Sequence, residues 1–137
     1  PLHKTDFPII NYDIGDMASS FTREGVRFIT KIHGRLNDMV KHENGESTSV
    51  LELRKIPNGI TGIAQFRYVQ DTYHDLRVEL VRDPKDTTYT NEEIDRFFRK
   101  RLQELYGDEF RIEICWLDVI PPDPNGKLRC FVCNVKE

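Results

Sequence analysis

The segment 91–106 restricts the folds open to this chain more than any other stretch of the sequence. Its apolar residues recur every three or four positions, as in an amphipathic helix, and they are Ile94, Phe97, Phe98, Leu102, Leu105 and Tyr106. Thr90 precedes the segment, Glu93 follows it at capping-box spacing, and Gly107 is a typical helix end. A helix with one apolar face must cover a sheet or another helix, so the sequence predicts a layered domain.

Alternating apolar and polar residues on both sides of this helix predict strands. Two of them, 60–70 and 74–82, are separated by a short polar loop and form a hairpin. A third strand, 110–116, follows the helix, and a fourth, 127–135, ends the chain after a Pro-rich loop.

A shorter strand and a second helix precede the hairpin. The strand is expected at 39–42, and the helix at 49–56, where Ser49 and Glu52 have capping-box spacing. From residue 39 onward the predicted order is strand, helix, strand, strand, helix, strand, strand. This order predicts an α+β fold, with two helices on a mostly antiparallel sheet.

The first part of the chain has a different character. Residues 17–21 and 26–32 alternate around the Gly-containing turn 22–25, which predicts a β-hairpin. We therefore expect a small all-β unit at 1–37 and the α+β domain at 38–137. The chain starts with proline rather than methionine, and we expect it to be a piece of a longer protein, with most of the first unit outside it.

Composition excludes some classes of partner. The chain has 137 residues, 31% of them charged, and a net charge of −3 with both signs interspersed. This balance argues against nucleic acid or an anionic membrane as the main partner. No apolar run approaches the roughly 18 residues of a membrane span.

Three cysteines and no secretory signal predict a reducing, cytoplasmic compartment. Cys130 and Cys133 have the spacing of a metal knuckle, but residues three apart on a strand face opposite sides. We therefore expect structural thiols and no metal site. The histidines have no metal-ligand spacing and are interpreted as surface or packing residues; they are His3, His33, His42 and His74.

Three polar clusters lie in predicted loops, at 12–16, 34–38 and 125–127. Taken singly, each is explained by a turn, because Asp, Asn and Gly are favoured there. Together they form an ordered set: Asp-x-Gly-Asp, then Gly-Arg-x-x-Asp, then Asn-Gly-Lys near the end of the chain. The set is more specific than any of its parts.

This ordered set resembles the C-terminal signatures of the adenylate-forming superfamily, which includes acyl-CoA synthetases, peptide-synthetase adenylation domains and luciferases. The matching segments are 12–16, 34–41 and 122–127. Residues 7–16 and 126–135 further resemble the phenylacetate-CoA ligase-like group, to which proteins linked to capsular polysaccharide loci belong. The resemblance covers nearly the whole chain, but only the last part of such a protein.

The resemblance implies a role for five residues. Tyr12, Asp16 and Arg35 would bind ATP or AMP, Asp16 through the ribose hydroxyls and Arg35 at the ribose and phosphate side. Asp38 would be the hinge of a rotating C-terminal lid. Lys127 would be the catalytic lysine, bridging the substrate carboxylate and the α-phosphate during adenylyl transfer.

The implied reaction joins a carboxylic acid to ATP, giving an acyl-adenylate and pyrophosphate, with transfer to CoA as the expected second step. Mg²⁺ would accompany the ATP phosphates, bound mostly by the missing N-terminal part. The sequence departs from the family pattern at Asn11 and across 40–46. The acceptor therefore stays open between CoA, another thiol, an amine or none, and the fragment alone is expected to be inactive.

Two alternatives remain at this point. The same order of strands and helices occurs in stand-alone ferredoxin-like modules that sense ligands or mediate interactions, and such a module would bind an effector or self-associate. A catalytically inactive homologue would share the fold, although Lys127 argues against that reading.

Overall fold

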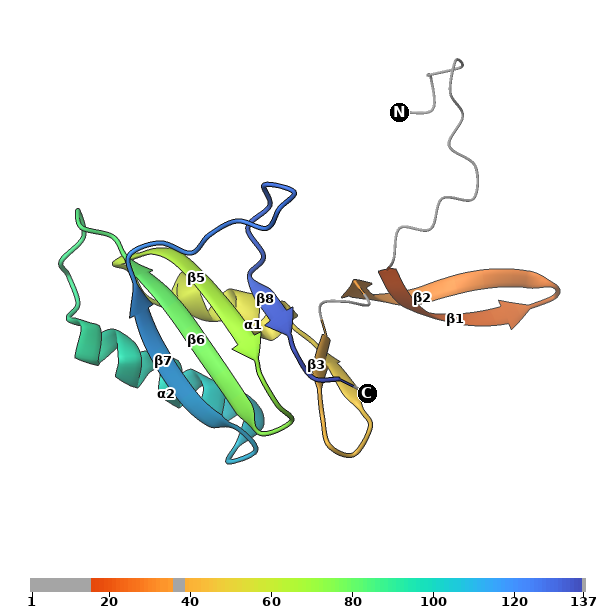
Figure 1. Cartoon of the computed structure of the whole chain (residues 1–137). Helices are drawn as coiled ribbons and strands as arrows, with labels where there is room; N and C mark the ends of the chain where they lie inside the picture. The colour runs from red at the N-terminus through yellow and green to blue at the C-terminus, as the bar shows by residue number, and fades with distance from the viewer. Residues whose placement is uncertain (1–15, 36–38, 137) are drawn as a thin grey trace, which may run out of the picture. The chain divides into compact units, whose positions relative to one another are not determined.

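The computed structural model of the chain describes residues 16–35 and 39–136 (Figure 1). The chain divides into two compact units, Pro1–Asn37 and Asp38–Glu137. No helix among the described residues is long and apolar enough to cross a membrane.

The first unit contains an antiparallel hairpin of β1 (Asp16–Arg23) and β2 (Val26–Arg35). The predicted hairpin is confirmed, with strands that reach further than expected. The turn is only two residues long because Glu24 and Gly25 both have positive φ, 52° and 79°. This backbone is typical of the tight turns that match the twist of a hairpin.

The second unit consists of one four-stranded sheet, one small hairpin and two helices. The strand order in the sheet is β7-β6-β5-β8, with β5 and β6 antiparallel and the two outer strands parallel to their neighbours. Across the described chain, three of the five strand pairs are antiparallel. The predicted α+β class with two helices is therefore confirmed. The elements are β3 (Met39–Lys41), β4 (Ser47–Ser49), α1 (Leu51–Lys55), the 3₁₀ turn η1 (Ile56–Gly59), β5 (Ile63–Gln70), β6 (Asp75–Arg82), α2 (Asn91–Tyr106), β7 (Arg111–Leu117) and β8 (Phe131–Cys133).

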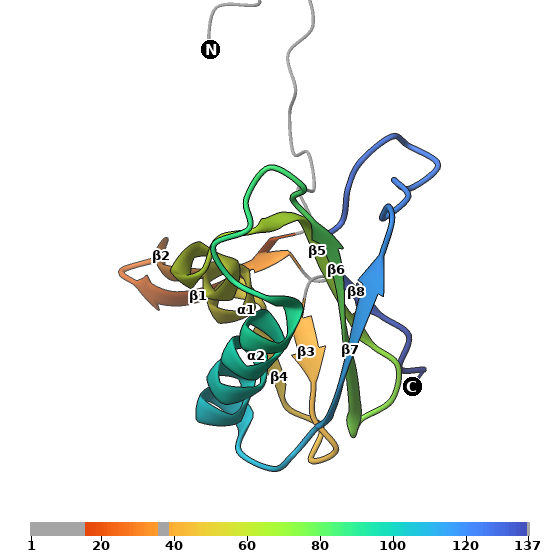
Figure 2. The same cartoon turned by 90° about the vertical axis from the view of Figure 1, so that its left-hand side faces the viewer.

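Helix α2 has the predicted bounds and the predicted caps. The backbone N–H of Thr90 donates to Glu93 Oε2 at 2.8 Å, and the N–H of Glu93 donates to Thr90 Oγ1 at 3.3 Å. Gly107 ends the helix with φ of 59°. Ile94 and Phe98 are completely buried, so the apolar stripe faces the sheet, and Figure 2 shows α2 lying along that face.

Helix α1 is shorter than predicted, and its predicted capping box is wrong. Ser49 ends strand β4, which pairs with β3 and was not predicted. The Ser49 hydroxyl instead accepts from the N–H of Leu51 at 3.3 Å. Val50 is the N-cap residue and has no side-chain cap bond. The strand pairing takes precedence over the cap.

One core joins the small hairpin to the sheet. Tyr68, Leu76 and Phe98 are among its fully buried side chains, and each large apolar group contributes roughly 1.5–3 kcal/mol on burial. Val40 from β3 and Val50 beside β4 belong to the same cluster. The chain is therefore packed into this domain from the first residues after the boundary between the two units.

The last predicted strand, 127–135, is confirmed only at Phe131–Cys133. Lys127 belongs to a turn instead, because its carbonyl accepts a hydrogen bond from the N–H of Asp123 at 2.9 Å. Arg129 forms an ion pair with the same Asp123. These contacts close a loop where the alternation predicted a strand.

Candidate functional site

Two of the predicted nucleotide-binding residues are brought together by the first hairpin. Asp16 begins β1, Arg35 ends β2, and the two are Cα partners at the open end of the ladder. One residue from each of two polar clusters of the sequence is therefore placed at the same end of this hairpin. Tyr12 and the proposed hinge Asp38 lie outside the described residues.

Lys127 lies on the long loop between β7 and β8. A tight turn precedes it, in which the N–H of Gly126 donates to the carbonyl of Asp123 at 2.7 Å. Gly126 has φ of 73°, a left-handed backbone that favours glycine. The Lys127 side chain is exposed, and no carboxylate of the described residues lies within ion-pair distance of it. The loop therefore presents an accessible positive charge.

This loop is braced at both ends. Ile120 is buried, and its N–H donates to Gln65 Oε1 of β5 at 2.9 Å. Phe131, where the loop ends, is 2% exposed and sits in the core. The lysine is thus carried by a loop with fixed ends rather than by a free tail.

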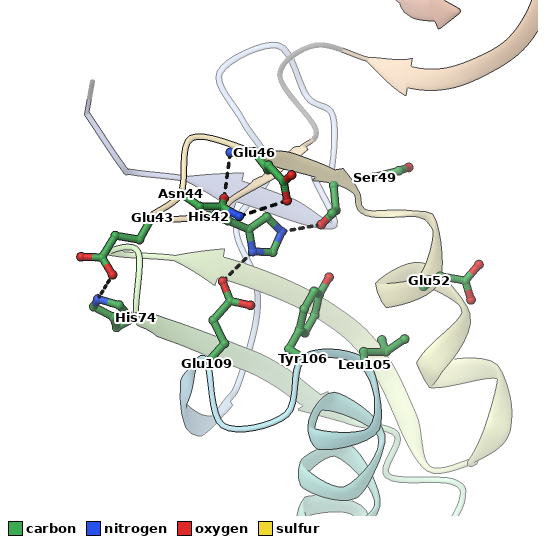
Figure 3. Close-up of a pocket in the computed structure, with 11 residues that line it drawn as sticks. His42, Glu43, Asn44, Glu46, Ser49, Glu52, His74, Leu105, Tyr106 and Glu109 are labelled. Carbon is green, nitrogen blue, oxygen red and sulfur yellow. Dashed lines mark hydrogen bonds and ion pairs between the residues drawn. The ribbon is translucent and has the colours of Figure 1, made fainter.

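A pocket that the sequence did not predict lies elsewhere on the same unit (Figure 3). It has a volume of about 660 Å³ and opens between the β3–β4 hairpin, α1 and the C-terminal end of α2. The residues that line it include four glutamates and no lysine or arginine: His42, Glu43, Asn44, Glu46, Thr48, Ser49, Glu52, His74, Leu105, Tyr106 and Glu109.

His42 is the best connected residue of this pocket. Its Nδ1 lies 2.5 Å from Glu109 Oε1, and its Nε2 lies 2.8 Å from Thr48 Oγ1. A carboxylate only accepts, so Nδ1 carries a proton; in the neutral ring Nε2 then accepts the hydroxyl proton of Thr48. The His42 side chain is 11% exposed and that of Glu109 33%, so this pair is partly withdrawn from water.

Tyr106 extends the same set of contacts. Burial raises the pKa of Tyr106 to about 12, and a hydrogen bond between Tyr106 and Thr48 opposes that rise. The phenol therefore stays protonated at neutral pH.

A second imidazole–carboxylate contact lies at this pocket, between His74 Nε2 and Glu43 Oε2 at 3.4 Å. Figure 3 shows the side chains of His42 and His74 meeting glutamates from different parts of the chain.

The cysteines and the possible metal ligands form no reactive centre in the part of the chain that the structure describes. The three thiols are free and half-buried. Burial raises the pKa of the Cys115 thiol, so it stays protonated at neutral pH. Among the described residues, no three His, Cys, Asp or Glu side chains are grouped so that they could hold a metal ion.

Sequence reasoning could not have found this pocket. His42 was interpreted as a surface or packing residue, and its partner Glu109 is 67 residues away in the chain. Neither residue belongs to a motif. Only the packing of the β3–β4 hairpin beside the end of α2 brings them together.

Solved structures with a similar fold include a CoA ligase and a CoA synthetase. A 2-hydroxyisobutyryl-CoA ligase in the postadenylation state, in complex with R3-HIB-AMP, has a TM-score of 0.53 at 19% identity, over 87% of this chain and 27% of that one. MatB from Rhodopseudomonas palustris gives 0.52 at 18% identity, over 78% and 24%. Acetoacetyl-CoA synthetase from Streptomyces lividans gives 0.50 at 15% identity, over 72% and 15%.

At these identities the solved structures show the fold alone, and this chain spans about a quarter or less of their length. No curated protein gives a significant match. The family profile described as the CapK C-terminal domain matches residues 39–134, which is most of the chain. The expected resemblance is therefore confirmed: the chain belongs to the CapK C-terminal domain family and has the fold of part of the CoA ligases.

Proposed function

We propose that the chain is part of an ATP-dependent carboxylate-activating enzyme of the phenylacetate-CoA ligase-like group. Residues 1–37 would end its large domain, and residues 38–137 would form its C-terminal lid. The enzyme would form an acyl-adenylate from a carboxylic acid and ATP, release pyrophosphate, and pass the acyl group to CoA in the cytoplasm. Family membership and the ordered series of three motifs support this proposal.

The placement of Lys127 carries the proposal. An exposed ammonium group without a described carboxylate partner has its full charge available for a ligand. Adenylyl transfer builds negative charge between the attacking carboxylate and the α-phosphate, and a cation delivered there stabilises it. A braced loop that returns at both ends to the sheet can bring such a charge to a fixed point as the lid moves.

The nucleotide would be held at the other unit. Asp16 and Arg35 are partners across β1 and β2, so a ribose recognised by one would lie near the other. Tyr12 is proposed to line the same site. Mg²⁺ would accompany the phosphates, and its ligands are expected in the rest of the enzyme, because the described residues offer no cluster of ligands.

Asp38 is the proposed hinge. It lies at the boundary between the two compact units, and hinges are loop positions that absorb backbone change. A 2-hydroxyisobutyryl-CoA ligase of this fold has been solved in a postadenylation state, in an open conformation and in a thioesterification state. We propose that rotation at Asp38 separates activation of the acid from transfer of the acyl group.

The test is carboxylate-dependent ATP–pyrophosphate exchange by the full-length protein, across aryl, fatty and sugar-derived acids. Exchange with any acid supports the adenylating enzyme and identifies the substrate class. No exchange by a folded protein across the whole panel contradicts the proposal. It then favours an inactive homologue or an interaction module, and the 137-residue chain would be used to search for a partner.

A further inference from the structure

The contacts of His42 have the arrangement of a base poised to take a proton. A carboxylate, Glu109, lies on one ring nitrogen, and a hydroxyl, Thr48, lies on the other. The carboxylate fixes the imidazole with its basic nitrogen turned to the hydroxyl, and it stabilises the positive charge that follows proton uptake. Figure 3 shows Glu109 and His42 meeting in the wall of the pocket.

The lining of the pocket restricts what can enter it. Glutamates from the β3–β4 hairpin, from α1 and from the turn after α2 line the space. Glu52 pairs with Lys55 at 2.6 Å, and two of the others contact imidazoles. The lining contains no arginine or lysine. A phosphate group would therefore be repelled, whereas an uncharged or cationic group would be accepted.

The pocket and Lys127 lie at opposite ends of the second unit. The loop that carries Lys127 is at the top of this unit in Figures 1 and 2, and the tip of the β3–β4 hairpin is at the bottom. His42 is only four residues after Asp38, the proposed hinge. The unit thus carries an ammonium group at one end and an imidazole surrounded by glutamates at the other. These two ends suit two different chemical steps.

We propose that His42 is the general base of the acyl-transfer step and that Glu109 is its positioning residue. This inference rests on the proposed function. The acceptor replaces the Thr48 hydroxyl at His42 Nε2. A thiol gives its proton to this nitrogen as its sulfur attacks the acyl carbonyl carbon; a neutral amine attacks through its lone pair and then gives a proton from its nitrogen to His42. The bond from the acyl carbon to the phosphate oxygen breaks, and AMP leaves with the electron pair. His42 then releases the proton to water.

The acceptor is accordingly a nucleophile that must lose a proton and is carried on an uncharged or cationic group. The thiol end of CoA meets this description, with its nucleotide end kept outside the pocket, and so does a small primary amine. The two are distinguished by measuring acid-dependent AMP release by the full-length enzyme with CoA and, separately, with ethanolamine. The acid is the one identified by pyrophosphate exchange.

The decisive variant is His42→Asn, whose amide can still donate to Glu109 but cannot act as a base. AMP release to the preferred acceptor is expected to fall roughly 100-fold or more relative to pyrophosphate exchange by the same variant. Hydroxylamine, which is already unprotonated at neutral pH, should restore hydroxamate formation. If the ratio of AMP release to pyrophosphate exchange is undiminished in His42→Asn with both acceptors, the inference is overturned and the proposed function still stands. If the unaltered enzyme shows no pyrophosphate exchange, both the inference and the proposed function are contradicted.

The positioning role of Glu109 has its own readout. Glu109→Gln keeps an acceptor for His42 Nδ1 but removes the negative charge beside the imidazolium. The acidic limb of the pH profile for AMP release should move to lower pH, with a roughly tenfold lower maximum. Glu104→Gln, at an exposed α2 residue paired with Arg101 at 2.8 Å, is the matched control and should leave the profile in place. An identical profile in both variants contradicts the role of Glu109.

A measurement on the 137-residue chain itself is independent of activity. Nitrogen-15 NMR of the histidine rings distinguishes the two tautomers. The inference predicts that neutral His42 carries its proton on Nδ1, and that Glu109→Gln changes the proton signal of that nitrogen. A neutral His42 protonated on Nε2 overturns the inference, because its basic nitrogen would then face Glu109 rather than Thr48.

Discussion

The side-chain amide of Gln70 forms two hydrogen bonds with the backbone of Lys41. Lys41 N–H donates to Gln70 Oε1 at 3.0 Å, and Gln70 Nε2 donates to the carbonyl of Lys41 at 2.6 Å. Gln70 is completely buried at the end of β5. The two bonds tie β3 to the sheet, so the chain is fixed within its domain only three residues after the proposed hinge at Asp38.

Replacing Gln70 by Leu should destabilise the chain. The substitution leaves the N–H and the carbonyl of Lys41 without their side-chain partner beside the core, at a cost of roughly 2–4 kcal/mol. Urea denaturation of the 137-residue chain measures the loss. Gln103→Leu, at an exposed position of α2, is the control, with an expected change within about 0.5 kcal/mol. Equal losses in the two variants would show that the amide pair adds nothing to stability.

Tyr106 should make the chain less stable as the pH rises through the alkaline range. Its pKa is raised from 10.0 to about 12, mainly by burial, so the folded state holds the phenolic proton where the unfolded state has released it. This contribution is complete below pH 10 and is lost as the pH rises toward 12. Burial also raises the pKa of Tyr68, which acts in the same direction.

The pH dependence is checked by urea denaturation across that alkaline range. Tyr106→Phe should flatten the decline in the free energy of unfolding, because Phe has no proton to release. Tyr89→Phe, at an exposed position, is the control and should follow the unaltered chain. A Tyr106→Phe curve with the original slope would show that this phenol does not ionise differently in the folded state.

Asp16 and Arg35 should act together on the nucleotide. In the full-length protein, Asp16→Asn and Arg35→Gln are each expected to weaken ATP binding roughly 10- to 100-fold, because each removes a charged hydrogen-bonding group. Since the two positions are partners across the hairpin, the double variant should lose less than the sum of the single losses. Calorimetric titration measures the affinities. Glu24→Gln, at the exposed turn of the same hairpin, is the control.

An unchanged ATP affinity in both single variants would place the nucleotide away from this hairpin. Fully additive losses would be consistent with two independent contacts rather than one shared site.

Local signals made part of this fold predictable. Helix α2 was predicted with its bounds because its caps, its apolar stripe and Gly107 all lie within the segment itself. Helix α1 was not, because the Ser49 cap competes with a strand pairing to β3 that a local pattern does not contain. The last strand was predicted too long because Asp123 holds Lys127 and Arg129 in a loop.

The candidate sites divide in the same way. Lys127 was predicted because it belongs to an ordered motif, and motifs are read along the chain. The Glu109–His42–Thr48 contacts were missed because each residue is ordinary in its own segment. Their chemistry arises only when the β3–β4 hairpin packs beside the end of α2, which is a property of the folded domain.

Lys127→Ala in the full-length protein tests the central claim most directly. Because the ammonium group acts on charge that builds in the transition state, acid-dependent pyrophosphate exchange should fall roughly 100- to 1,000-fold, while ATP affinity changes little. Lys85→Ala, at another exposed loop lysine, should leave both quantities unchanged. Loss of exchange with retained ATP binding is the result that this account predicts. Exchange by Lys127→Ala at the rate of the unaltered enzyme would contradict it.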